Sequence, residues 1–231
     1  TGQEPRQREN EQFKAQNFRI TDEHLGEGSA KTKFGYNIAA IQTLKQIEAE
    51  GRQARPDEQE ILSRYVGWGG IPQAFDEENT QWSEEYRQLK ELLTEKEYDA
   101  ARSSTLNAHY TSPTVIRAMY DAIEKMGFRT GNVLEPSCGV GNFFGMLPDD
   151  MSGSRLYGVE LDSITGRIAR QLYPDARITI SGFEKTQRRD FFDLAIGNVP
   201  FGGYKVSDKQ FDKYNFLIHD YFFAKTLEQV R

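Results

Sequence analysis

The stretch that decides the fold of this chain reads NVLEPSCGVGNF, at residues 132–143. Its first half is a short apolar run, which predicts a buried strand over 132–136. Its second half is a turn with two glycines, which let the backbone adopt positive φ angles and approach a ligand closely. A strand, a glycine turn and a short helix in this order indicate the first unit of an α/β sheet.

Three further apolar runs follow, at residues 155–161, 177–181 and 192–197, and a helical pattern over 164–173 separates the first two. Strands that alternate with helices predict parallel β-α-β units. Sheets of this kind bind their ligands at the carboxyl ends of the strands. The residues that follow each run are therefore the candidates for a functional site.

The first 106 residues have a helical rhythm instead. Apolar residues at helical spacing predict helices over 34–50, from Pro56 onward and over 83–102, and the sequence GWGGIP at 67–72 interrupts the pattern. A further helix is expected from Pro113 to about Gly127. The chain is therefore expected to divide into an acidic helical extension, residues 1–106, and an α/β domain, residues 107–231.

The net charge is −6, and it belongs to the first half, because residues 111–231 hold equal numbers of basic and acidic side chains. A general basic surface for nucleic acid is absent, so any polyanion would need a local patch. One cysteine excludes a disulfide framework, and three scattered histidines predict no metal site. A polar N-terminus and the lack of a long apolar run predict no signal peptide, no membrane association and a cytoplasmic location.

Acidic and aromatic residues follow the first three strands. Glu135 precedes the glycine turn, where a carboxylate would repel a pyrophosphate but suits a cationic ligand. Glu160 comes about 20 residues later, where an acidic side chain can accept hydrogen bonds from ribose hydroxyls. Asp162 is expected to cap the next helix. Phe183 and Glu184 could enclose a purine, although a core role for Phe183 and a plain tight turn at the glycines remain open.

The fourth strand ends in NVPF at residues 198–201. The amide oxygen of Asn198 and a neighbouring main-chain carbonyl can both accept from one exocyclic amino group. Phe201 can stack on the base that carries this group. An ordinary Asn-Pro surface turn is the alternative for the isolated motif. Lysines and aromatics alternate over 202–216, which fits either a DNA-contacting loop or an ordinary solvated one.

Taken together, these motifs resemble the adenine-N6 DNA methyltransferases of the S-adenosylmethionine-dependent, Rossmann-like superfamily. LEPSCGVGNF (134–143) matches their glycine motif, GVELD (158–162) their acidic motif and, more loosely, GFE (182–184) their third-strand motif. NVPF matches their Asn-Pro-Pro-Phe motif except at Val199. HYTSP (109–113) resembles their N-terminal cofactor motif, in the gamma-type order.

The resemblance implies S-adenosyl-L-methionine as cofactor, double-stranded DNA with a flipped adenine as substrate, and no metal. It implies a Rossmann-like methyltransferase sheet that is C-terminally incomplete after its fourth strand. The implied catalytic residues are Asn198, Val199, Pro200 and Phe201. The implied cofactor-binding residues are His109, Tyr110, Thr111, Glu135, Pro136, Cys138, Gly139, Gly141, Glu160, Leu161, Phe183 and Glu184. Since the family uses the main-chain carbonyl at position 199, valine there need not abolish the chemistry.

Two segments of the extension, LGEGSAKTKF (25–34) and RYVGWGGIPQAF (64–75), resemble large methylase–helicase proteins of phages and conjugative elements. This resemblance implies a bacterial, phage or mobile-element protein, a link to restriction and modification, and a helicase region of the same polypeptide as a partner. The motifs leave two alternatives open. One is methylation of RNA adenine or of a protein glutamine, and the other is a non-catalytic module for DNA docking or anti-restriction.

Overall fold

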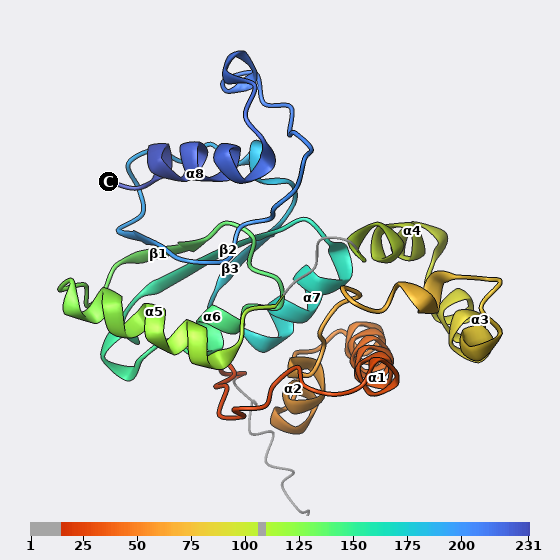
Figure 1. Ribbon diagram of the computed structural model, residues 1–231. Helices are drawn as coiled ribbons and strands as arrows, with labels where there is room; N and C mark the ends of the chain where they lie inside the picture. The colour runs from red at the N-terminus through yellow and green to blue at the C-terminus, as the bar shows by residue number, and fades with distance from the viewer. Residues whose placement is uncertain (1–14, 106–109) are drawn as a thin grey trace, which may run out of the picture.

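The computed structural model describes residues 15–105 and 110–231, which fold around a parallel sheet (Figure 1). Its strand order is β3-β2-β1-β4, and all neighbours run parallel. The strands are β1 (Asn132–Glu135), β2 (Arg155–Glu160), β3 (Arg177–Ile180) and β4 (Leu194–Ala195). The predicted α/β class with a parallel sheet is confirmed, and β4 is shorter than the expected run over 192–197.

Helices precede the sheet and cover both of its faces. Helices α5, α6 and α7 lie on one face and α8 lies on the other, while α1 to α4 form a group beside α7 (Figure 1). None of the helices within the described ranges is long and apolar enough to cross a membrane. Their bounds are α1 (Ala30–Ala49), α2 (Pro56–Ser63), α3 (Ser83–Leu92), α4 (Glu95–Ser104), α5 (Pro113–Lys125), α6 (Asn142–Gly145), α7 (Ser163–Leu172) and α8 (Ile218–Gln229).

The single helix expected over 83–102 is wrong, because the chain forms two helices there. Leu93 has an extended backbone with ψ of 142°, and Thr94 begins α4 with a capping box. The Thr94 hydroxyl accepts from the Glu97 N–H, while the Glu97 carboxylate accepts from the Thr94 N–H at 3.0 Å. Reciprocal capping satisfies N–H groups that would otherwise lack partners at a helix start, so a new helix begins at this point. The apolar residues keep their helical spacing across the break, and periodicity therefore does not reveal it.

The sheet is apolar on both faces, as expected for a parallel sheet covered by helices. Along β2 the side chains alternate, so that Leu156 joins one buried cluster while Tyr157 and Val159 join the other, beneath α8. The first cluster continues into the extension through the buried faces of α1 and α2, including Ile41 and Leu62. The domain boundary between residues 106 and 107 lies outside the described residues and stays a prediction.

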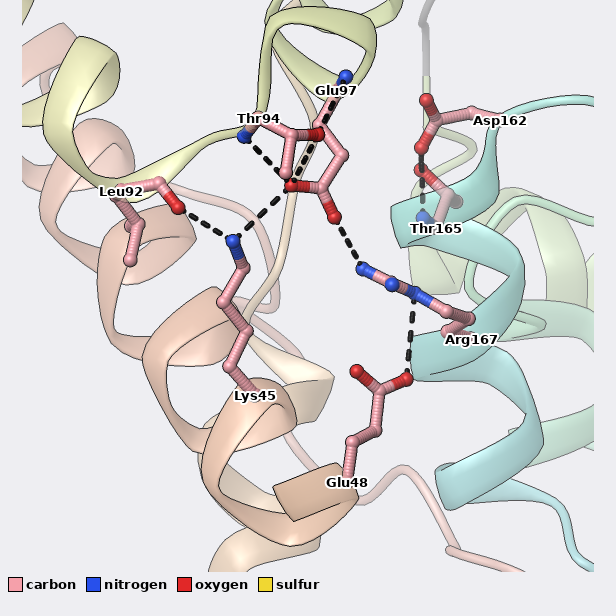
Figure 2. A network of polar contacts seen from close by, with 8 residues as sticks. All are labelled: Lys45, Glu48, Leu92, Thr94, Glu97, Asp162, Thr165 and Arg167. Carbon is pink, nitrogen blue, oxygen red and sulfur yellow. Dashed lines mark hydrogen bonds and ion pairs between the residues drawn. The ribbon is translucent and has the colours of Figure 1, made fainter.

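Ion pairs join the extension to α7 (Figure 2). Arg167 Nη2 donates to the Glu97 carboxylate at 2.8 Å, and Arg167 Nε lies 3.4 Å from the Glu48 carboxylate. Lys45 Nζ reaches the other Glu97 oxygen at 3.1 Å. Burial alone would raise the pKa of Glu97, but the Thr94 N–H, Lys45 and Arg167 outweigh it and lower this pKa to about 2. The start of α4 is thereby fixed beside α7.

Candidate functional site

A cavity of about 640 Å³ lies at the carboxyl ends of the strands. This volume falls within the usual range for small-molecule sites. The segments that follow all four strands contribute to its lining, together with residues of the extension. Among the residues predicted from sequence, those that line the cavity are Tyr110, Thr111, Glu135, Pro136, Cys138, Gly139, Glu160, Leu161, Phe183, Glu184, Asn198, Val199, Pro200 and Phe201.

Two predicted cofactor residues are not among the lining residues. His109 lies outside the described residues. Gly141 has a φ of 87° and precedes α6, where a side-chain carbon would come within 2.6 Å of the Tyr173 ring. Gly141 therefore shapes the turn behind the cavity. Gly139, with φ of 56°, faces the cavity instead, and a side-chain carbon there would meet the Tyr110 ring at 3.2 Å.

Cys138 lies beneath the glycine turn and links it to the second strand. Its N–H donates to the Val159 carbonyl at 2.9 Å. The residue is 4% exposed. Burial raises the pKa of Cys138 well above its ordinary value, and the Glu135 and Glu160 carboxylates add to the effect. The side chain is therefore a neutral thiol that packs against the sheet, and not an activated nucleophile.

Glu160 connects the first two strand ends. Its carboxylate accepts from the Gly139 N–H at 2.9 Å and from the Asp162 N–H at 2.7 Å. Burial raises the pKa of Glu160 to about 7, with the Asp162 charge adding to it, although the two backbone donors oppose the shift. Asp162 caps α7 as expected, since its side chain accepts from the Thr165 N–H at 2.8 Å. The carboxylate of Glu160 is thus held in place and titrates near neutrality.

Glu135 is the most buried acidic side chain of the cavity lining, at 3% exposure. Its Oε2 atom has no hydrogen-bond partner among the described residues. Burial raises the pKa of Glu135 well above its ordinary value, and the nearby Glu160 raises it further. A buried polar atom without a partner is rare in a folded protein. Glu135 thus brings an acidic group that lacks a full set of hydrogen bonds to the lining of the cavity.

The NVPF segment forms another part of the wall. Asn198 is exposed, and its main-chain carbonyl accepts from the Ser137 hydroxyl at 2.9 Å. Phe201 is 62% exposed, and its ring stacks on His219 of α8 at 5.8 Å between centroids and 30° between planes. The amide of Asn198 and the ring of Phe201 are therefore both accessible to a planar ligand.

The third strand end is held from the opposite side by α8. Phe183 is 3% exposed and stacks on Phe222 at 4.9 Å between centroids. The main-chain carbonyl of Glu184 accepts from Lys225 Nζ at 3.1 Å. Phe183 thus has both a core contact and a place at the cavity wall, so the two alternatives that the sequence left open for it are compatible.

Sequence reasoning missed a group of lining residues that come from the extension. They are Tyr65, Gly67, Ala100, Ser103 and Ser104. It also missed His219 beneath Phe201. Apolar periodicity identifies the buried side of each helix. It does not predict which helix will lie beside the ends of the strands in the folded chain.

Comparison with known proteins gave two curated relatives. Over 170 residues, 72% of this chain, it is 28% identical to the "Defense against restriction protein B" of Escherichia phage P1. Over 79 residues, 34% of this chain, it is 35% identical to the "Type II methyltransferase M.CvrRI" of Paramecium bursaria Chlorella virus XZ-6E. The matched regions span only 6% and 21% of the lengths of those relatives. No protein-family model matches the chain.

Among solved structures, the chain is similar to a Listeria monocytogenes protein described as a candidate class I S-adenosylmethionine-dependent methyltransferase. The alignment covers 87% of this chain and 71% of that one, with 15% identity and a TM-score of 0.42.

Proposed function

We propose that this chain is an S-adenosylmethionine-dependent methyltransferase that acts on the N6 amino group of adenine in double-stranded DNA. The observation that carries the proposal is that the segments after all four strands line one cavity, with the buried Glu135 among the lining residues. The names of two relatives, a type II methyltransferase and a phage protein of defence against restriction, support it.

The residues of the cavity fit the charge pattern of the cofactor. S-adenosyl-L-methionine would supply an electrophilic methyl group on a positively charged sulfur. The Glu135 carboxyl, which is buried and has a free oxygen, would face this charge. The Glu160 carboxylate would accept from the ribose hydroxyls while it remains fixed by the Gly139 N–H. Tyr110 and Thr111 would contact the methionine part, together with His109.

The NVPF segment would hold the target. The side-chain oxygen of Asn198 and the main-chain carbonyl of Val199 or Pro200 would accept from the adenine amino group, which makes the nitrogen lone pair more available. Phe201 would stack on a base that has left the duplex, at a cost of a few kcal/mol for unstacking. Positioning and electrostatics would provide most of the rate increase.

The test is a methyl-transfer assay with tritiated S-adenosylmethionine on unmethylated DNA, RNA and protein. Transfer to DNA adenine is expected, and Asn198→Ala is expected to remove it while calorimetry shows unchanged cofactor binding. Phe201→Ala is expected to reduce transfer. Phe223→Ala is the matched control, because Phe223 is similarly exposed, at 58%, but lies on α8 outside the cavity lining. Intact transfer by Asn198→Ala would disprove the catalytic assignment.

The second candidate function is a non-catalytic module for DNA docking or anti-restriction, and the phage P1 relative favours it. Val199 stands where the Asn-Pro-Pro-Phe motif has proline, and a change in the catalytic motif is what a module that has lost catalysis would carry. The same assay separates the two functions. A protein that binds S-adenosylmethionine and DNA but transfers no methyl group to any of the three substrates would support the docking module. Transfer to RNA or protein alone would redirect the substrate assignment.

A further inference from the structure

We propose that the extension supplies one wall of the cofactor site, through the turn at Tyr65–Gly67 and the side of α4 that carries Ala100, Ser103 and Ser104. This inference deepens the proposed function and rests on it. In this arrangement the cofactor lies between the strand ends and the extension, and the RYVGWGG sequence at residues 64–70 serves to build that wall.

A buried asparagine fixes the turn. Asn37 of α1 is fully buried; its side-chain NH₂ donates to the Gly67 carbonyl, and its oxygen accepts from the Val66 N–H at 2.9 Å. Gly67 has a φ of 65°, which favours glycine, and the Trp68 ring is buried in the core beside it. Satisfied polar groups in a core specify one conformation, so the turn is a preformed element.

Tyr65 presents its side chain to the cavity from this turn. It is 2% exposed and still lines the cavity. Asp162 and Thr165, at the start of α7, line the same cavity, and the Asp162 charge contributes to the raised pKa of Tyr65 after its burial. Because Asp162 follows Glu160 by two residues, Tyr65 stands at the end of the cavity where Glu160 is proposed to hold the ribose.

The side of α4 that faces the cavity carries small residues only. Ala100, Ser103 and Ser104 have the i, i+3, i+4 spacing of one helical face, and all three line the cavity. Small side chains leave room for a ligand between the helix and the strand ends. The segments that follow all four strands line the same cavity opposite these residues, so α4 and the strand ends border one space.

The ion pairs of Figure 2 hold this wall at a set distance. Glu97, in the first turn of α4, is bound by Arg167 of α7, and the N-cap of α7, Asp162, lines the cavity. A shift of α4 away from the cavity would break this pair. Cofactor binding and docking of the extension are therefore expected to stabilise each other.

The experiment measures S-adenosylmethionine binding by calorimetry in the 231-residue chain and in three variants, with the unfolding temperature of each free protein as the folding check. Ser104→Leu, which fills the cavity side of α4, is expected to weaken binding about 10-fold or more. Tyr65→Phe keeps the ring, and loss of its hydroxyl is expected to weaken binding about 3- to 10-fold. Arg102→Leu on the same helix is the control, because Arg102 is exposed and outside the cavity lining, and its affinity is expected to stay unchanged.

Hydrogen exchange distinguishes contact with the cofactor from a purely structural role of these residues, because only contact makes their exchange rates depend on the cofactor. Added S-adenosylmethionine is expected to slow exchange at residues 65–67 and 100–104 in the unmodified chain. Normal affinity in both Ser104→Leu and Tyr65→Phe, or exchange in these segments that the cofactor does not alter, would overturn the inference. If the unmodified chain binds no S-adenosylmethionine, the proposed function fails first. If Glu160→Ala weakens S-adenosylmethionine binding while Ser104→Leu and Tyr65→Phe leave it unchanged, the inference about the wall is wrong and the proposed function stands.

Discussion

The Ser137 hydroxyl donates a 2.9 Å hydrogen bond to the main-chain carbonyl of Asn198. Ser137 belongs to the turn after β1, and Asn198 follows β4, so the bond joins the ends of two neighbouring strands. It fixes the peptide that leads into Val199, whose own carbonyl is a proposed acceptor for the target amino group. The cofactor end and the target end of the proposed site are therefore mechanically linked.

Ser137→Ala is expected to reduce methyl transfer roughly 3- to 10-fold, because one hydrogen bond that orients the Asn198 peptide is lost. Cofactor affinity is expected to stay within about twofold of the original. Single-turnover transfer and calorimetry measure the two quantities. Ser152→Ala, at an exposed serine outside the cavity lining, is the control. A Ser137→Ala protein with full transfer activity would show that the bond has no catalytic importance.

Cofactor affinity is expected to rise as the pH increases through about 7, the pKa of Glu160 in the free protein. The carboxylate must be ionised to accept from two hydroxyls, so binding releases a proton below that pH. Calorimetry in two buffers with different ionisation enthalpies measures the release. Glu160→Gln is expected to bind more weakly and to lose the pH dependence, and an unchanged pH dependence in this variant would contradict the assignment.

The same pKa has a consequence for the free protein. Folding raises the pKa of Glu160 above its ordinary value of 4.5. The contribution of this group to the free energy of unfolding is therefore fully present below pH 4.5. The contribution is lost as the pH rises toward 7. The stability of Glu160→Gln relative to the unmodified chain is therefore expected to increase from pH 5 to pH 8, because only the unmodified chain loses this contribution. Urea titrations at the two pH values measure this difference.

Glu97→Gln is expected to lower the free energy of unfolding at pH 7 by about 1 to 3 kcal/mol. Folding lowers the pKa of Glu97 from 4.5 to about 2, so its contribution is present above 4.5 and is lost as the pH falls toward 2. The unmodified chain and Glu97→Gln should therefore converge in stability in acid. Glu91→Gln, at an exposed position of α3, should behave like the unmodified chain. A constant difference between pH 7 and pH 3 would show that the Thr94 N–H, Lys45 and Arg167 do not stabilise the Glu97 carboxylate.

Gly141→Ala is expected to destabilise the fold by roughly 2 to 4 kcal/mol, since the new methyl group would lie 2.6 Å from the Tyr173 ring and φ is 87°. Gly51→Ala is the comparison, because Gly51 also has a positive φ, of 62°, but a side-chain carbon there meets no atom within 4 Å. It should lose only about 1 to 2 kcal/mol. Chemical denaturation measures the loss in free energy of unfolding for each variant. Equal losses would show that the Tyr173 ring moves away from the new methyl group without destabilising the fold.

The strands and their ends could be predicted because the signals are local. Short apolar runs between helical segments identified β1, β2 and β3 within a residue or two, and the glycine turn followed from two glycines at fixed spacing. The fourth run yielded only Leu194–Ala195 as a strand. The helix over 83–102 failed for a local reason that periodicity does not reveal, since Thr94 and Glu97 cap each other while the apolar residues keep their spacing.

From the order of the amino acids alone follow the parallel α/β sheet, the acidic and aromatic strand ends, and the resemblance that suggests a methyltransferase. These features depend on residues close in the chain or on a rule of sheet topology that gathers strand ends at one edge. The folded chain adds the wall built by Tyr65 and α4, the unpartnered Glu135 oxygen, and the near-neutral pKa of Glu160. Burial and contact between distant segments arise only when the whole chain packs together, so no local pattern encodes them.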